Sequence, residues 1–240
     1  MYEQRTYRHS IKDADLVSFQ AAVKETDLFI RASKDLSAEA VAAIKEVRGP
    51  LERYIRAHPV FLHSLEPLKV GKDAPEIIQR MEQAARLANV GPMAAVAGAV
   101  AQMVGEELLR SSGEVIVENG GDIYLKVSRK SVIAIYAGES VFTGKLAIEV
   151  EPDRTPLGVC TSSGRVGPSL SLGMADAAVV VAPSAALADA AATAVGNAVK
   201  SERDVDAALD LGRRIKGISG IVVIAGSNMG AWGDISLVKI

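Results

Sequence analysis

The spacing of hydrophobic and polar residues predicts strand segments that alternate with helices. Residues 2–9 and 14–32 alternate polar and apolar side chains, which predicts two or three antiparallel strands joined by short turns. A helical pattern covers 37–57, and 60–72 is expected to be extended. A further helix begins at Pro75, where apolar residues recur every three or four positions. The first third of the chain therefore mixes both element types.

The remaining two thirds continue the same mixture, with two helices built from small residues. The expected helices are 91–110, 183–197 and 203–215. The expected strands are a hairpin over 114–127, single strands at about 131–137, 145–151, 156–162 and 177–182, and a closing hairpin of 221–225 with 235–240. This composition of elements predicts an α+β fold.

The helix at 183–197 is the most informative stretch. Almost all of its residues are small, so backbone or a ligand can approach it closely. Asp189, Thr193 and Asn197 are spaced four residues apart and share roughly one face. Their oxygen atoms suit a hard cation such as Mg²⁺. The spacing leaves a second interpretation open, a buried alanine helix whose Asp and Thr cap neighbouring loops.

The order of elements suggests an internal repeat. A small-residue helix followed by a hairpin occurs twice, and Gly121-Asp122-Ile123 in the first copy matches Gly233-Asp234-Ile235 in the second. We therefore expect one domain over 1–240, made of two repeats at approximately 1–130 and 131–240.

Two glycine-rich segments and two helix starts are candidate binding sites. In the turn at 118–122, adjacent glycines would let backbone amides approach a ligand, although a plain hairpin turn explains the same residues. The loop at 161–169 offers hydroxyls and amides to a phosphate, or serves only as a connector. The helix starts near Gly91-Pro92 and at Ser184 are potential anion sites.

Charge and composition exclude several classes of protein. The net charge is −2 with acids and bases interspersed, which gives no basic surface for nucleic acid. The single cysteine, Cys160, rules out an internal disulfide framework and is expected to be a core residue. We see no signal peptide and no apolar run of membrane-spanning length, so we expect a cytoplasmic protein without membrane contact.

Three motifs in order resemble the ApbE superfamily of FAD:protein FMN transferases. They are Asn119-Gly120-Gly121-Asp122, then Thr161-Ser162-Ser163-Gly164, then the Ala-Asp-x-x-x-Thr-Ala segment that contains Asp189 and Thr193. The resemblance extends over roughly 90–200 and implies a duplicated, T-fold-like α+β architecture. It implies FAD or FMN as the bound nucleotide, with Mg²⁺ on Asp189 and Thr193. Gly91, Pro92, Met93 and the first two motifs would form the rest of the flavin pocket.

One family segment is missing. Transferases of this superfamily carry a His-Ile-Ile-Asp-Pro-x-Thr-Gly stretch, whereas 169–176 here contains no histidine. Asp176 is the nearest carboxylate that could replace it. The resemblance thus implies binding of a flavin nucleotide or similar diphosphate with Mg²⁺, and FMN transfer to a serine or threonine of a protein acceptor. The alternatives are a non-catalytic flavin carrier, or a different enzyme on the same fold with another phosphorylated ligand.

Overall fold

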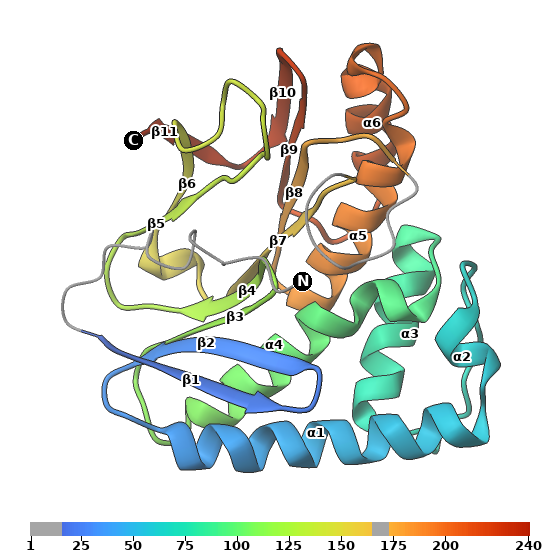
Figure 1. Ribbon diagram of the computed structural model, residues 1–240, viewed down its shortest axis with the longest axis vertical. Helices are drawn as coiled ribbons and strands as arrows, with labels where there is room; N and C mark the ends of the chain where they lie inside the picture. The colour runs from blue at the N-terminus through green and yellow to red at the C-terminus, as the bar shows by residue number, and fades with distance from the viewer. Residues whose placement is uncertain (1–15, 165–172) are drawn as a thin grey trace.

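A computed structural model describes residues 16–164 and 173–240 of the chain. The strand predicted at 2–9 and part of the loop predicted at 161–169 lie outside these ranges. The described residues form three layers, with helices, a large sheet and a small sheet stacked in that order (Figure 1).

The large sheet has eight strands in the order β1-β2-β3-β4-β7-β8-β9-β10, and every neighbouring pair is antiparallel. Their bounds are β1 (Val17–Val23), β2 (Thr26–Ala32), β3 (Val115–Asn119), β4 (Asp122–Lys126), β7 (Leu157–Ser162), β8 (Ala177–Ala182), β9 (Gly220–Ala225) and β10 (Asn228–Gly233). The strands β8 and β9, each with a neighbour on both sides, are buried at every position, which explains their continuous apolar sequences.

Helices cover one face of this sheet, and a three-stranded sheet covers the other (Figure 1). The helices are α1 (Ser37–Ala57), α2 (Val60–His63), α3 (Glu76–Ala88), α4 (Val96–Leu108), α5 (Ala185–Ala198) and α6 (Val205–Gly212), with 3₁₀ turns η2 (Pro92–Ala95), η3 (Pro152–Arg154) and η4 (Glu202–Asp204). The small sheet has the order β11-β6-β5, with β5 (Ser131–Ala134), β6 (Leu146–Val150) and β11 (Ser236–Lys239). The predicted α+β class is confirmed.

The two halves of the large sheet repeat one order of elements. Each half consists of two strands, a helical connection and two more strands, first β1 to β4 and then β7 to β10. The matching tripeptides do not follow this order, because Asp122 opens β4 in the large sheet whereas Asp234 precedes β11 in the small one. The similarity between the halves therefore rests on the order of their strands and helices, and not on the matching tripeptides.

Two predicted elements are wrong. The segment 60–72 is not wholly extended, because Pro59 already has helical dihedral angles and residues Val60–His63 continue as α2. The closing hairpin pairs β9 with β10, not with 235–240. Gly226, with φ of +60°, forms the tight turn between β9 and β10, and Gly233, with φ of +89°, lets the chain leave for the small sheet.

The chain turns sharply between α3 and the η2–α4 segment, which are bent by 104° relative to each other. No single helix in 16–164 or 173–240 is long and apolar enough to cross a membrane, and only this bent pair passes by length and composition. The apolar face of α3, including Ile77, Ile78 and Met81, is buried in the main core.

Small residues let α5 lie directly on its neighbours. A Cβ at Gly98 of α4 would lie 2.2 Å from the carbonyl oxygen of Ala185, the first residue of α5. A Cβ at Gly158 of β7 would lie 2.3 Å from the Cα of the same alanine. Backbone therefore meets backbone on both sides of Ala185, and nothing larger than glycine fits.

We predict that Gly158→Ala lowers the free energy of unfolding by about 1–3 kcal/mol or more, because the added methyl overlaps backbone that cannot rotate away. Gly113→Ala is the matched control, since a Cβ at Gly113 would meet nothing within 4 Å. Its effect should stay within about 0.5 kcal/mol. Urea denaturation measures both, and equal stabilities of the two variants would contradict this packing.

Candidate functional site

Two separate elements converge on the first turn of α4. The backbone N–H of Gly98 donates to Oδ2 of Asp189 on α5 at 2.8 Å. The side-chain amide of Asn119, from the β3–β4 turn, donates to the carbonyl oxygen of Ala97 at 3.1 Å. The structure therefore brings two of the three predicted motifs together at the first turn of α4.

Asp189 acts as the N-terminal cap of a neighbouring helix. Its carboxylate accepts from the N–H groups of Gly98 and Ala97, two donors that have no partner inside α4. The positive end of the helix dipole favours a negative group at this place. The capping interpretation left open by the sequence therefore fits Asp189, whose Oδ2 accepts from the N–H of Gly98 while the side chain is partly buried. Burial and the nearby Asp122 raise the pKa of Asp189 well above its ordinary value.

Asp122 is the second carboxylate of this cluster. It is only 8% exposed, and its Oδ1 has no hydrogen-bond partner. The backbone N–H of Thr161 and the thiol of Cys160 lie beside the carboxylate and favour its ionised form. Burial is the main cause that raises the pKa of Asp122 to about 7, and the charge of Glu118 adds to it. A buried acceptor without a partner costs about 1–3 kcal/mol, so this oxygen calls for an explanation.

The adjacent glycines form the tight hairpin turn that the sequence predicted. Gly120 and Gly121 have φ of +68° and +107°, conformations that disfavour other residues. The N–H of Gly121 already donates to Oε1 of Glu118 at 2.9 Å. Gly120 is exposed, and a Cβ there would meet nothing within 4 Å. Of the two expected amides, that of Gly121 is engaged within the turn.

The Thr161–Gly164 motif is divided between two surroundings. Alternation along β7 puts Ser162 on the helix face with Cys160, whereas the Thr161 side chain belongs to the opposite face. Ser162 lies near Gly196 at the end of α5. The N–H of Gly164 donates to the carbonyl of Ala175 at 2.9 Å. The N–H of Thr161 lies beside the carboxylate of Asp122. Ser163, the next residue after Ser162, is partly buried.

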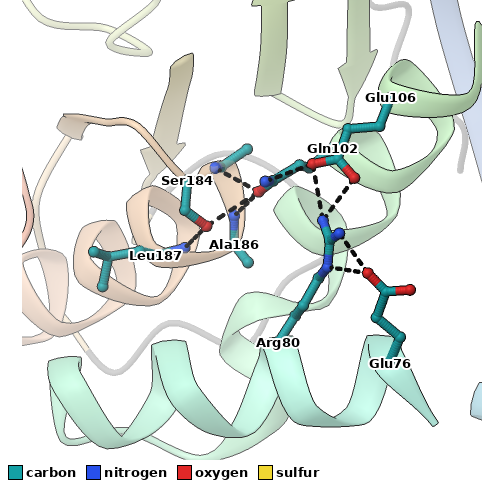
Figure 2. Close-up of polar contacts among 8 residues, drawn as sticks. Glu76, Arg80, Gln102, Glu106, Ser184, Ala186 and Leu187 are labelled. Carbon is teal, nitrogen blue, oxygen red and sulfur yellow. Dashed lines mark hydrogen bonds and ion pairs between the residues drawn. The ribbon is translucent and has the colours of Figure 1, made fainter. Parts of the chain in front are cut away.

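The predicted anion site at the start of α5 is occupied by the protein's own side chains. At α5, Oε1 of Gln102 accepts from the N–H groups of Ala185 and Ala186, and Oγ of Ser184 accepts from that of Leu187 (Figure 2). At the other start, Gly91 is buried because its Cα packs on the carbonyl of Ser64. Pro92 and Met93 follow in the η2 turn, ahead of the first turn of α4 that Asp189 caps.

An ion-pair network fixes Gln102 in this capping position. Its amide nitrogen donates to Oε1 of Glu106 at 3.0 Å, and Arg80 pairs with Glu106 and with Glu76 (Figure 2). Gln102 could not be identified from sequence, because the groups that it caps, at the start of α5, lie more than eighty residues away along the chain. Cys160 was identified only as a core residue, which it is, but it also contacts Asp122. Burial and the two carboxylates raise the pKa of this thiol, which disfavours the thiolate form that a nucleophilic cysteine needs.

The remaining candidates lie on α5 and at the start of β8. Thr193 is one turn beyond Asp189 on the same helix and is partly buried. Asp176, 1% exposed, accepts at 2.6 Å from the N–H of Gly226 in the β9–β10 turn. That contact connects the residue before β8 to the β9–β10 turn, which is a structural role for Asp176. A catalytic role for Asp176 stays a prediction.

The donor set of the cluster suits a small, hard cation. Within the described ranges, no three His, Cys, Asp or Glu side chains gather closely enough to hold a metal ion by themselves. Two carboxylates, a threonine hydroxyl and backbone groups nevertheless supply the oxygen ligands that Mg²⁺ prefers, and the unsatisfied Oδ1 of Asp122 is such a ligand. The larger described cavity, about 310 Å³, is lined by residues of α1, α3 and α4 and of the segment before α3, and shares none with this cluster.

Relatives and solved structures resemble this chain over most of its length. UPF0280 proteins of Methanosarcina acetivorans and Methanocaldococcus jannaschii are 42% and 43% identical to it, and the matches cover 89% and 90% of this chain and 85% and 91% of theirs. The flavinyl transferase ApbE of Pseudomonas stutzeri, in its apo form, superposes with a TM-score of 0.61 at 15% identity, covering 92% of this chain and 96% of that one. The flavin transferase ApbE of Vibrio cholerae gives 0.59 at 13% identity, covering 92% and 98%.

At 15% and 13% identity, the two transferases show only that the fold is shared. The family of this chain is shown by the match of its sequence to a family model. The family model described as AbpE bacteria matches residues 8–225, which is most of the chain and includes all three motifs and both carboxylates. The protein therefore belongs to this ApbE-like family.

Proposed function

We propose that this chain binds a flavin nucleotide, or a related diphosphate, together with Mg²⁺ at the first turn of α4. The observation that carries the proposal is the meeting of Asp189 with Gly98 and of Asn119 with Ala97, close to the buried carboxylate of Asp122. Kinship with an ApbE-like family and a shared fold with flavin transferases support the choice of ligand. The duplicated, T-fold-like character of the two half-sheets belongs to the same proposal.

Within this proposal, Asp189 and Thr193 hold Mg²⁺ from adjacent turns of α5. Asp189 does so while one of its oxygens remains on the Gly98 N–H. The bound cation would neutralise the diphosphate and stabilise negative charge that develops on it. Gly120 leaves an open approach at the tip of the hairpin, and Asn119 fixes that hairpin against α4. The chain's own residues thus position the cation and the turn relative to each other.

The catalytic form of the proposal is transfer of FMN from FAD to a serine or threonine of a protein acceptor. A flavin carrier without turnover is the second form. It is favoured by the absence of any histidine after His63, which leaves the family's usual general base without a counterpart in the later motifs. We place either form in the cytoplasm, with a small-molecule nucleotide as its partner and without nucleic acid or membrane.

Incubation with FAD and MgCl₂ tests the function. We predict Mg²⁺-dependent flavin binding, followed by flavin fluorescence, that weakens at least about tenfold in Asp189→Asn. Asparagine keeps the cap on α4 and removes only the charge, so the variant should fold. Asp153→Asn, at an exposed carboxylate, is the control. Unchanged affinity in Asp189→Asn would contradict the metal assignment, and release of AMP, measured by chromatography, would distinguish the transferase from the carrier.

We further predict that, in EDTA, the protein loses stability as the pH rises from about 4 to about 7. The unfolded state releases the proton of Asp122 near pH 4, while the folded state keeps it until about pH 7. The native state therefore binds more protons in this window, and each such group lowers stability by at most about 1.4 kcal/mol per pH unit. Asp189 shifts in the same direction.

Urea denaturation at several pH values measures this trend, and saturating MgCl₂ should abolish much of it by stabilising the ionised carboxylates. A stability that rises between pH 4 and pH 7 in EDTA would show that the two carboxylates ionise easily in the folded protein.

A further inference from the structure

We propose that Asp122 is a second carboxylate ligand of the cation, so that Asp122 and Asp189 bind one divalent ion between the β3–β4 hairpin and α5. This inference rests on the proposed function, because it concerns the same ion. It changes the chemistry of the site, since the resemblance assigns only Asp189 and Thr193 to the metal and leaves Asp122 in the wall of the flavin pocket.

The first argument is the state of the Asp122 side chain. More than nine tenths of it is buried, yet Oδ1 has no hydrogen-bond partner. The groups that reach its carboxylate are the N–H of Thr161 and the thiol of Cys160. Buried carboxylate oxygens in folded proteins are almost always satisfied by a donor, a water or an ion. An ion is the candidate that fits an oxygen facing a second carboxylate.

The second argument is the direction in which Asp122 points. Asp122 lies directly opposite Asn119 in the β3–β4 pair, so the two side chains share one face of the sheet. Asn119 reaches Ala97 at the first turn of α4, and Tyr124, two residues after Asp122, packs on Gly105 farther along the same helix. Asp122 therefore faces the N-terminal end of α4, where Asp189 binds Gly98.

The third argument links Asp122 to α5 itself. The Sγ of Cys160 contacts the Asp122 carboxylate and lies 3.3 Å from the carbonyl oxygen of Ala185, one turn before Asp189. Cys160 therefore connects the strand beside Asp122 with the helix that carries Asp189, and within the described ranges no lysine or arginine is a charged neighbour of either carboxylate. Two negative groups held this way lack only a positive partner.

Charge balance favours this pair over one carboxylate with a hydroxyl. In the protein without nucleotide, two carboxylates neutralise a divalent cation, whereas Asp189 with Thr193 leaves it one charge short in a largely buried place. Glu118 belongs to the same hairpin but pairs with Ile123, whose side chain packs in the core on the face of the sheet away from the helices, so Glu118 lies on the face opposite Asp122.

Binding of Mn²⁺, measured by electron paramagnetic resonance with Mg²⁺ as competitor, tests the proposal without FAD or turnover. We expect wild type to bind Mn²⁺ and both Asp122→Asn and Asp189→Asn to lose at least about tenfold in affinity. Asp153→Asn should bind like wild type. Asparagine has nearly the same shape as aspartate, so weaker Mn²⁺ binding in Asp122→Asn would reflect the loss of a ligand and not a change in packing.

Thermal unfolding supplies the second measurement. In EDTA at pH 8, Asp122→Asn should unfold at the same temperature as wild type or higher, because it removes a buried carboxylate. In MgCl₂, wild type should gain stability and Asp122→Asn should gain little. A lower unfolding temperature of this variant in EDTA would assign Asp122 to the fold and overturn the proposal.

The outcomes separate this inference from the proposed function. If Asp122→Asn binds Mn²⁺ as tightly as wild type while Asp189→Asn does not, Asp122 is no ligand and the proposed function survives. If wild-type protein binds Mn²⁺ neither alone nor with FAD, both proposals fail.

Discussion

The close contact of α5 with α4 and β7 is the constraint on which the rest of the structure depends. Ala185 opens α5 between Gly98 and Gly158, with no room for a side chain on either neighbour. Only a helix of small residues can lie this near to both a strand and another helix. The packing fixes the depth and the direction of α5, and with them the place of every side chain that α5 carries.

This placement sets the chemistry of the candidate site. Because α5 crosses α4 at Gly98, the Asp189 carboxylate meets the first N–H groups of α4 and caps them. The hairpin that carries Asn119 and Asp122 is held against the same turn. One packing requirement thus concentrates two carboxylates at the positive end of a helix, an arrangement that a divalent cation would complete.

Much of the fold was predictable from the pattern of residues. The buried strands, the small-residue helices and the Asn119-Gly120-Gly121 turn each depend on local sequence, and the structure has them where they were expected. The pairing of β10 with β9 was missed because Met229, Gly230 and Ala231 lack the alternation of a strand and look like part of a glycine-rich turn. Strand pairing there is decided by the sheet, and no local pattern reveals it.

The site was predictable only in part. Spacing and family resemblance identified Asp189 and the Asn119–Asp122 turn, but not their meeting at α4, which depends on contacts over ninety residues. The sequence also suggested anion sites at the helix starts near Gly91-Pro92 and at Ser184, whereas Gln102 caps α5 and Asp189 caps the first turn of α4. Capping partners distant in sequence leave no periodic pattern to detect.

The most direct test of the central claim is anomalous X-ray diffraction from crystals grown with MnCl₂. The account predicts an anomalous difference peak between the carboxylates of Asp122 and Asp189, beside the first turn of α4. A peak in the separate hollow lined by Glu46, Glu76 and Glu107, or no ordered Mn²⁺ in crystals of the intact protein, would contradict it.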